Sequence, residues 1–239
     1  MNLPVFTEYA PATLLRARPA GEAQAIIEIQ PPRGFLAAYA RPGQFCKIRV
    51  PSAGDCEGIF AMFSSPGEEP VRFLVRIGNP EGGECADCLA CSPDATSVEM
   101  TLPAGEGFAL ERARGRDVYF VATGTGVAPV RAAIEQVLSE RASYGRLSLD
   151  HGVRSLAHLA IAEDIARWET AGVRVALHVS MPEADGAPRG TTVQGALRER
   201  GGSLAGAAMV AVGQPEMLDA LLAEFVHLGG DPELFLKNV

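Results

Sequence analysis

Short runs rich in apolar residues, separated by proline and glycine turns, fill the first half of the chain. In residues 45–50 the even positions are apolar and two of the three odd positions are basic, which is the two-residue period of a strand with one buried face. Cys46 lies on the apolar side, so we expect a small buried side chain there. Several short strands at close spacing indicate a small antiparallel β-barrel. Such strands are predicted over residues 13–17, 23–30, 45–50, 59–64, 71–77 and 97–102.

The second half of the chain alternates strand-like runs with helix-like runs. This alternation indicates βαβ units around a parallel sheet, a Rossmann-like α/β domain whose ligands bind beyond the carboxyl ends of the strands. The change of pattern predicts two domains, residues 1–112 and residues 113–239. Strands are predicted over residues 117–122, 146–149, 173–180 and 207–212, and helices over residues 129–138, 156–168, 192–200 and 215–228.

A glycine-containing turn separates the first of these strands from the first helix. The segment Thr123-Gly124-Thr125-Gly126 breaks the apolar run, and Pro129 suits a first helical turn because its position has no helical N–H partner to lose. A strand that feeds a glycine turn and a helix N-terminus directs free N–H groups and a partial positive charge at one point. That point suits a phosphate, although an ordinary strand–helix turn explains the two glycines equally well because the full G-x-G-x-x-G spacing is absent.

Composition narrows the function classes. The chain has 239 residues, of which 47% are hydrophobic and 21% are charged, so it can bury a substantial core. Its net charge of −8 argues against nucleic-acid partners and against anionic membrane surfaces. No run approaches the roughly 20 apolar residues of a membrane helix, and the first residues lack a signal-peptide pattern, so we expect a cytoplasmic location.

Five short strings follow one another along the chain: Pro42-Gly43-Gln44-Phe45, Gly105-Glu106-Gly107-Phe108, the segment 122–129, Gly152-Val153-Arg154 and Gly213-Gln214-Pro215-Glu216-Met217. Taken in this order, they resemble the ferredoxin–NADP⁺ reductase superfamily. Residues 60–66 and 236–239 are most similar to the branch that includes plant fruit-protein-like reductases. The resemblance covers nearly the whole chain and implies an FAD-binding barrel followed by an NAD(P)-binding α/β domain.

The resemblance implies hydride transfer from NAD(P)H to FAD, and then electron transfer to an unknown acceptor, either a small molecule or a redox protein. It assigns catalysis to Phe63, which stacks on the flavin, and to Ser64, whose hydroxyl faces the central ring. FAD is further assigned to Arg76, Gly82, Gly83 and Cys85. NAD(P) is assigned to Thr123, Gly124, Thr125, Gly126, Val127, Pro129, Arg154, Gly213, Pro215 and Met217.

Position 181 bears on the dinucleotide preference, and the four histidines bear on the lining of the nucleotide site. Ser180 is followed by Met181 where NADP users of the superfamily often have arginine, so NAD is slightly favoured. His151 ends a predicted parallel strand and is expected to line the nucleotide site. The other histidines, at positions 158, 178 and 227, are expected to be structural.

Three positions depart from the superfamily pattern. Ala61 takes the place of the arginine of the flavin motif R-x-Y-S, Val212 that of a cysteine beside the nicotinamide, and Val239 that of a terminal aromatic residue. Loss of one buried charge-assisted contact costs about 1.5–3 kcal/mol, so FAD is expected to bind more weakly. An alternative is therefore a degenerate reductase that serves as a non-enzymatic nucleotide-binding or electron-transfer subunit.

Three of the five cysteines form the spacing C-x-x-C-x-x-C at Cys85, Cys88 and Cys91. On a loop this spacing is typical of iron–sulfur clusters, with Cys56 as the fourth ligand. The resemblance instead places the triplet on a short helix beside the FAD diphosphate, which favours small packed side chains and no metal. A third interpretation is a reactive thiol at Cys85, because a helix N-terminus lowers the pKa of a thiol.

Overall fold

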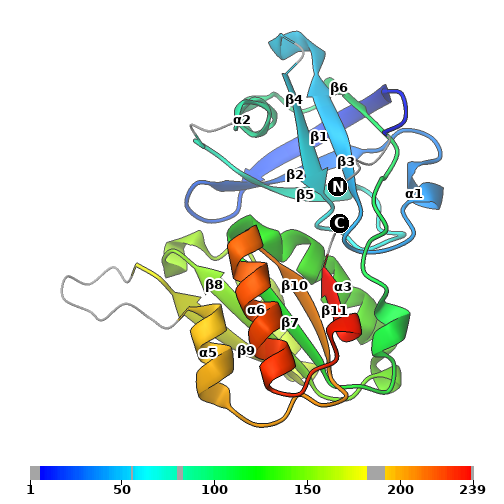
Figure 1. Cartoon of the computed structure of the whole chain (residues 1–239). Coiled ribbons are helices and arrows are strands. Elements are labelled where there is room, and N and C mark those ends of the chain that lie inside the picture. The colour runs from blue at the N-terminus through cyan, green and yellow to red at the C-terminus, as the bar shows by residue number, and fades with distance from the viewer. Residues whose placement is uncertain (1–5, 55, 80–82, 182–191, 238–239) are drawn as a thin grey trace.

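The computed structural model describes residues 6–54, 56–79, 83–181 and 192–237, which form two stacked domains (Figure 1). Each domain is built on one sheet, a six-stranded one first and a five-stranded one second. The predicted fold class, an antiparallel barrel of the FAD-binding type followed by a Rossmann-like parallel sheet, is confirmed. The barrel strands end at Met100 and the parallel sheet begins at Val118, so the proposed boundary after residue 112 falls within the connection.

The first sheet is an antiparallel, nearly closed barrel with strand order β4-β3-β6-β1-β2-β5. An isolated bridge between Met62 and Phe73 joins the end of β4 to β5 and so completes the wall. The even residues of β3 are buried, as the alternation predicts, and Cys46 is fully buried in the barrel core. Its elements are β1 (Ala10–Pro19), β2 (Gln24–Gln30), α1 (Phe35–Ala38), β3 (Phe45–Val50), β4 (Cys56–Ala61), β5 (Val71–Arg76), α2 (Glu84–Cys91) and β6 (Thr96–Met100).

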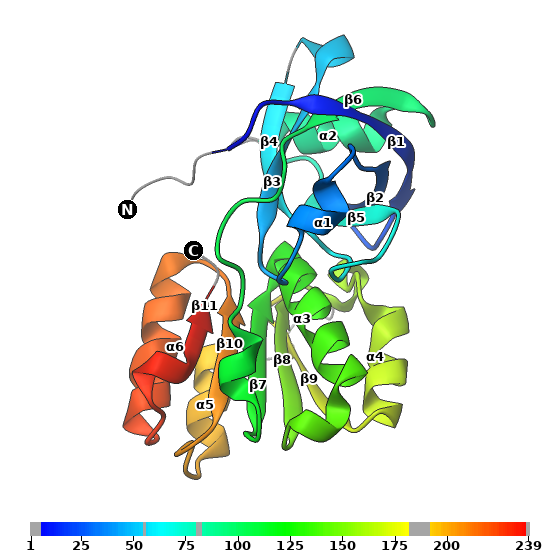
Figure 2. The same ribbon diagram turned by 90° about the vertical axis from the view of Figure 1, so that its right-hand side faces the viewer.

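The second sheet is fully parallel, with strand order β11-β10-β7-β8-β9. Helices α3 and α4 lie on one side of it and α5 and α6 on the other (Figure 2). The strands are apolar on both faces: Phe120 packs with α3, and Val121 packs with α5 and α6. The elements are β7 (Val118–Thr123), α3 (Val127–Ser139), β8 (Leu147–Val153), α4 (Ala162–Thr170), β9 (Val173–Val179), α5 (Val193–Arg200), β10 (Ala208–Val212), α6 (Pro215–His227) and β11 (Phe235–Lys237).

The two domains are joined by specific hydrogen bonds. The N–H of Glu22 donates to the carbonyl of Ala157 at 2.7 Å, and the side chain of Gln24 donates to the carbonyl of His158 at 2.8 Å. Gly21 has φ +98°, and a Cβ there would lie 2.7 Å from the Ala157 oxygen, so the β1–β2 turn needs glycine to approach the second domain. The turn is thus built for this contact.

Two predicted elements differ from the observed ones. The strand expected over residues 59–64 lies three residues earlier, as β4, because it pairs from Cys56 opposite Val50 to Ala61 opposite Phe45. The helix expected over residues 156–168 is interrupted: a 3₁₀ turn at Leu156–His158 precedes α4. Among the described residues, no helix is long and apolar enough to cross a membrane.

Candidate functional site

A cavity of about 780 Å³ lies between the domains, at the carboxyl ends of the parallel strands. This is where open parallel sheets bind ligands. From the barrel it is lined by Ala23, Gln24, Arg76, Ile77 and Gly78. From the second domain it is lined by Thr123, Gly124, Thr125, Gly126, Gly152, Val153, Arg154, His158, His178, Ser180, Thr192, Val193, Gln194, Val212, Gly213, Gln214 and Met217.

The glycine turn forms one wall of the cavity. After β7 the chain makes a 3₁₀ turn over Gly124–Gly126 and enters α3, and no side chain caps either helical segment. Gly124 has φ +52° with open space where a Cβ would be, whereas a Cβ at Gly126 would lie 3.1 Å from the Val212 side chain. The turn therefore directs unpaired N–H groups and the positive end of α3 at an anion in the cavity.

Two further glycines allow close packing around Thr123, beside this turn. A Cβ at Gly152 would lie 2.9 Å from the Thr123 methyl carbon. A Cβ at Gly213 would collide with the terminal methyl of Met217, whose sulfur accepts the Thr123 hydroxyl at 3.6 Å. Both glycines let neighbouring strand ends approach Thr123 closely.

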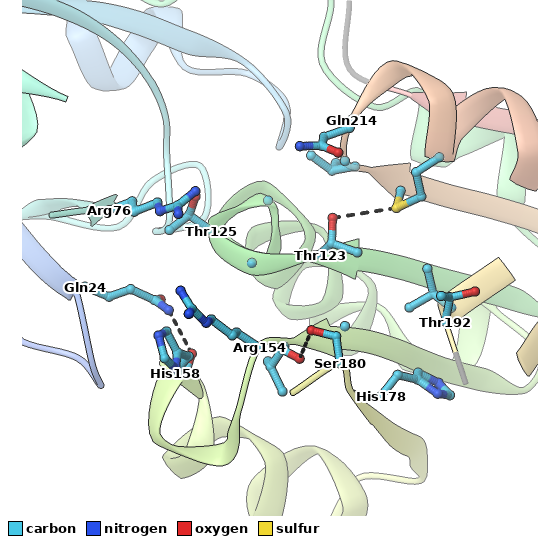
Figure 3. Close-up of a pocket in the computed structure, with 18 of the residues that line it drawn as sticks. Gln24, Arg76, Thr123, Thr125, Arg154, His158, His178, Ser180, Thr192 and Gln214 are labelled. Atoms are coloured by element: carbon cyan, nitrogen blue, oxygen red, sulfur yellow. Dashed lines mark hydrogen bonds between the residues drawn. The ribbon is translucent and has the colours of Figure 1, made fainter. Parts of the chain in front are cut away.

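The charge of the lining is one-sided. Arg76, Arg154, His158 and His178 are present, and the described lining residues include no aspartate or glutamate. In Figure 3, Arg76 reaches from the barrel to Thr125, while Arg154 extends towards Gln24 and His158. A cavity of this kind in a chain of net charge −8 is suited to an anionic ligand.

His178 is paired with a buried carboxylate. Its Nε2 lies 2.9 Å from Oδ1 of Asp150, which is 3% exposed on β8. His158 has its Nδ1 2.9 Å from the Ser155 hydroxyl and 3.6 Å from a carboxylate oxygen of Glu22. Both histidines were expected to be purely structural, yet both contribute to the cavity wall.

His151, expected to line the nucleotide site, does not do so. It is 1% exposed, and its Nδ1 lies 3.2 Å from the Ala122 carbonyl oxygen. Burial lowers the pKa of His151 to about 4, with a smaller contribution from neighbouring His178. His151 is therefore neutral at pH 7 and supports the strand from beneath the glycine turn.

The structure brings most of the assigned NAD(P) residues together. Three of the ten assigned NAD(P) residues are not in the cavity lining: Val127 and Pro129 are buried in the first turn of α3, and Pro215 is the first residue of α6. Eight of the assigned residues line the cavity, seven of them from the NAD(P) set and Arg76 from the FAD set: Thr123, Gly124, Thr125, Gly126, Arg154, Gly213, Met217 and Arg76.

The assigned flavin residues are more scattered. Gly82 lies outside the described residues. Gly83 precedes α2, and a Cβ at Gly83 would lie 2.8 Å from the Asn79 carbonyl oxygen. Cys85 is a buried residue in the first turn of α2. Of the assigned flavin residues that the structure describes, Arg76 is the one that lines the cavity.

Phe63 and Ser64 do not reach the cavity, because β4 ends before them. The Phe63 ring is 2% exposed and lies 4.4 Å below the Arg131 guanidinium carbon. The Ser64 hydroxyl accepts the Arg72 N–H at 3.0 Å and is fully buried. Both residues occupy the contact between the domains, where Phe63 lines a second, smaller cavity of about 210 Å³ together with Arg72 and Arg131.

The thiol triplet does not form a metal site. Its members diverge along α2: Cys85 is buried, Cys88 is partly exposed and Cys91 is exposed. Among the described residues no group of three or more His, Cys, Asp or Glu side chains is placed to hold a metal ion. The geometry therefore gives no support to an iron–sulfur cluster at this helix. The pKa of Cys85 is raised to about 12, chiefly by burial, so the expectation of a reactive thiol there is also unsupported.

Residues 120–222 match the family model of the oxidoreductase NAD-binding domain. The whole chain resembles a ferredoxin–NADP⁺ reductase from Neisseria gonorrhoeae with bound FAD and NADP, with a TM-score of 0.79 and 14% identity over 93% of this chain and 92% of that one. Residues 120–222 are therefore similar to the NAD-binding domain of oxidoreductases, and the chain as a whole has the two-domain fold of a ferredoxin–NADP⁺ reductase.

Curated relatives match only in part. The electron transfer subunit of dihydroorotate dehydrogenase B (NAD⁺) from Shouchella clausii is 35% identical over 38% of this chain and 35% of its own length. The fruit protein pKIWI502 of Actinidia deliciosa is 24% identical over 73% of this chain and 58% of its own length. The chain spans between 35% and 65% of the length of the first five curated relatives it matches.

Proposed function

We propose that this chain is an NAD(P)H-dependent flavoprotein reductase that passes electrons from a nicotinamide dinucleotide, through FAD, to a separate acceptor. The observation that carries the proposal is the cavity: an uncapped glycine turn opposite Arg76 and Arg154, with no carboxylate among its described lining residues. Such a lining fits the diphosphate of a dinucleotide.

The chain's own residues have separable roles in this proposal. The N–H groups of Gly124, Thr125 and Gly126 bind the diphosphate, and Arg154 neutralises its charge. Gly213 and Val212 form the apolar wall on which the nicotinamide packs. Bound FAD would accept the hydride and release its electrons to the acceptor.

The fit of FAD to the barrel rests on fewer groups. Arg76 is placed to meet a phosphate, and the N–H of Gly83 donates to the Asn79 carbonyl at 3.2 Å, which holds the N-terminus of α2 close to the end of β5. Glu84 and Asp87 lie in the first turn of that helix, however, where they oppose an anion. We therefore propose FAD binding at the barrel side of the cavity, weaker than the binding of the dinucleotide.

The proposal is tested by an anaerobic absorption spectrum of the purified chain, before and after addition of FAD. A flavin spectrum that bleaches on addition of NADH or NADPH is expected. A protein that remains colourless after incubation with FAD, and is separated from it by gel filtration, would contradict the reductase proposal.

Titration with both nucleotides addresses the dinucleotide preference. NAD-specific Rossmann sites bind the ribose 2′-hydroxyl with a carboxylate, and none lies among the described lining residues. Met181, which favoured NAD at the sequence level, is not among them either. The cavity therefore does not add to the preference for NAD.

A second candidate function is an electron-transfer or nucleotide-binding subunit of a larger enzyme. The fully buried Ser64, whose hydroxyl already accepts the Arg72 N–H, favours it, as does the similarity to an electron transfer subunit. Nucleotide binding without oxidation of NADH or NADPH, with FAD present and several artificial acceptors supplied, is the result that would select it.

Replacement of Arg154 by alanine is expected to weaken dinucleotide binding about 10- to 100-fold, because one charge-assisted phosphate contact of about 1.5–3 kcal/mol is lost. Isothermal titration with NADH and NADPH measures the effect. Arg146, whose side chain is 89% exposed and paired with Asp117, provides the matched control. Equal affinities for Arg154→Ala and Arg146→Ala would remove Arg154 from the site.

A further inference from the structure

Three thiols gather where α2 packs against β4, outside the cavity. Side chains alternate along a strand, so Cys56 and Gly58 point to the same face. A Cβ at Gly58 would lie 3.3 Å from the Cβ of Cys85, so the missing side chain lets the helix rest directly on the strand. Cys56 lies two residues before Gly58 on the strand and Cys88 one turn after Cys85 on the helix, and the side chains of Cys56 and Cys88 interact.

The contacts of these thiols agree with this geometry. Cys56 and Cys88 are both partly exposed and pack against the barrel core that contains Cys85. The Cys85 thiol is 4% exposed and donates to the Ile48 carbonyl at 3.5 Å.

The thiols of Cys85 and Cys88 both lie within hydrogen-bonding reach of Cys56. The hydrogen bond to Cys56 is the main cause that raises the pKa of Cys88 to about 11. Cys56 is therefore the thiol that the other two share.

Accessibility singles out one pair. Cys85 is enclosed by the core and occupied by its bond to Ile48, so a solute does not reach it. Cys91 is exposed at the last residue of α2, a full turn beyond Cys88. Cys56 and Cys88 combine mutual contact with access from solvent.

We propose that Cys56 and Cys88 form a redox-active dithiol, which closes to a reversible disulfide between β4 and α2 when low-molecular-weight disulfides are present. The Cys56 thiol attacks a sulfur of the small disulfide, breaks its S–S bond and releases one small thiol. The other cysteine then attacks the resulting mixed disulfide and releases the second small thiol. Two protein thiols are oxidised and one small disulfide is reduced to two thiols, with protons conserved.

The site is independent of the nucleotide cavity, and its oxidation needs neither FAD nor NAD(P)H. A closed disulfide ties α2 to β4, which restricts the unfolded chain over the loop between residues 56 and 88. The oxidised protein is therefore expected to unfold at a higher temperature than the reduced one.

Oxidation by glutathione disulfide, followed by alkylation and peptide mass spectrometry, tests the proposal. The experiment uses the full chain with Cys91→Ser, because the exposed Cys91 would itself form a mixed disulfide. Loss of two of the four remaining thiols, with a peptide that links Cys56 to Cys88, is expected. Dithiothreitol is expected to restore both thiols.

Two single variants complete the test. Cys56→Ser and Cys88→Ser, each in the Cys91→Ser background, are expected to keep a single mixed disulfide with glutathione and to form no internal link. Their circular dichroism spectra and thermal midpoints check that both fold. Four thiols that all remain free, or a peptide that links Cys56 to Cys85, would overturn the proposal.

Discussion

Replacement of Arg131 by methionine is expected to lower the free energy of unfolding by about 3 kcal/mol or more. Arg131 is 6% exposed on α3. Its Nε and Nη2 donate to the two oxygens of Asp164 at 2.9 and 3.2 Å, and its Nη1 donates to the Phe63 carbonyl at 3.1 Å. Methionine fills much of the same space but removes both charge-assisted bonds to Asp164, which then keeps only Arg167 at 2.7 Å, and leaves the buried Phe63 carbonyl without this donor. Chemical denaturation followed by circular dichroism measures the loss.

The control for this prediction is Arg41→Met. Arg41 also bridges distant segments, with its Nη2 2.7 Å from Glu111, but both side chains are about half exposed. Exposed pairs contribute about 1 kcal/mol or less, so this variant is expected to unfold almost like the parent chain. If the two variants lose the same stability, Arg131 does not hold the domains together.

Stability is expected to fall by about 3 kcal/mol as the pH drops from 6.5 to 4, because of His151. The pKa of this histidine is lowered by burial from 6.5 to about 4 in the folded chain. Between these values the unfolded chain binds a proton that the folded chain does not, so acid favours unfolding. Each unit of pKa difference corresponds to about 1.4 kcal/mol. The stability is fully present above pH 6.5 and is lost as the pH falls towards 4.

The His151→Asn variant separates this contribution from others. Asparagine can still donate to the Ala122 carbonyl but does not titrate, so the slope of stability against pH in this window is expected to flatten. Glu57, Asp117 and Glu135, whose pKa values are lowered from 4.5, 3.8 and 4.5, lose their contributions only at lower pH. An unchanged slope in His151→Asn, with the exposed His227→Asn as reference, would exclude His151 as the cause.

The pattern of apolar and polar residues along the chain was sufficient to predict the two-domain architecture. The alternation of residues 45–50 reports a half-buried strand directly, because each residue's own polarity determines its face. The strand, glycine turn and helix around Gly124 are likewise encoded within one continuous segment, which is why most of the residues predicted to bind NAD(P) lie along one cavity.

The sequence did not reveal that Phe63 and Ser64 lie at the contact between the domains, because strand register is not local. Ile59 to Phe63 is the most apolar run in its region, so the pattern favours a strand over residues 59–64. Pairing with β3 instead begins the strand at Cys56, whose neighbours Glu57 and Gly58 give no such signal. Phe63 and Ser64 consequently fall beyond the strand, where α3 of the other domain covers them.

His158 and His178 were missed for a related reason. His158 follows a helical pattern but lies in the 3₁₀ turn that precedes α4, and this turn contacts the barrel. His178 follows a strand pattern, and its access to the cavity depends on the pairing of β9 with β8. Both positions are set by contacts between distant segments, which a pattern along the chain does not contain.

The hydrogen bond from Gln24 to the His158 carbonyl joins two residues that also line the cavity. The wall of the cavity and the contact between the domains are thus the same group of atoms at this point. A ligand bound there is expected to stabilise the contact as well, so hydrogen exchange at the amides of residues 22–24 and 157–159 is expected to slow when the cavity is occupied.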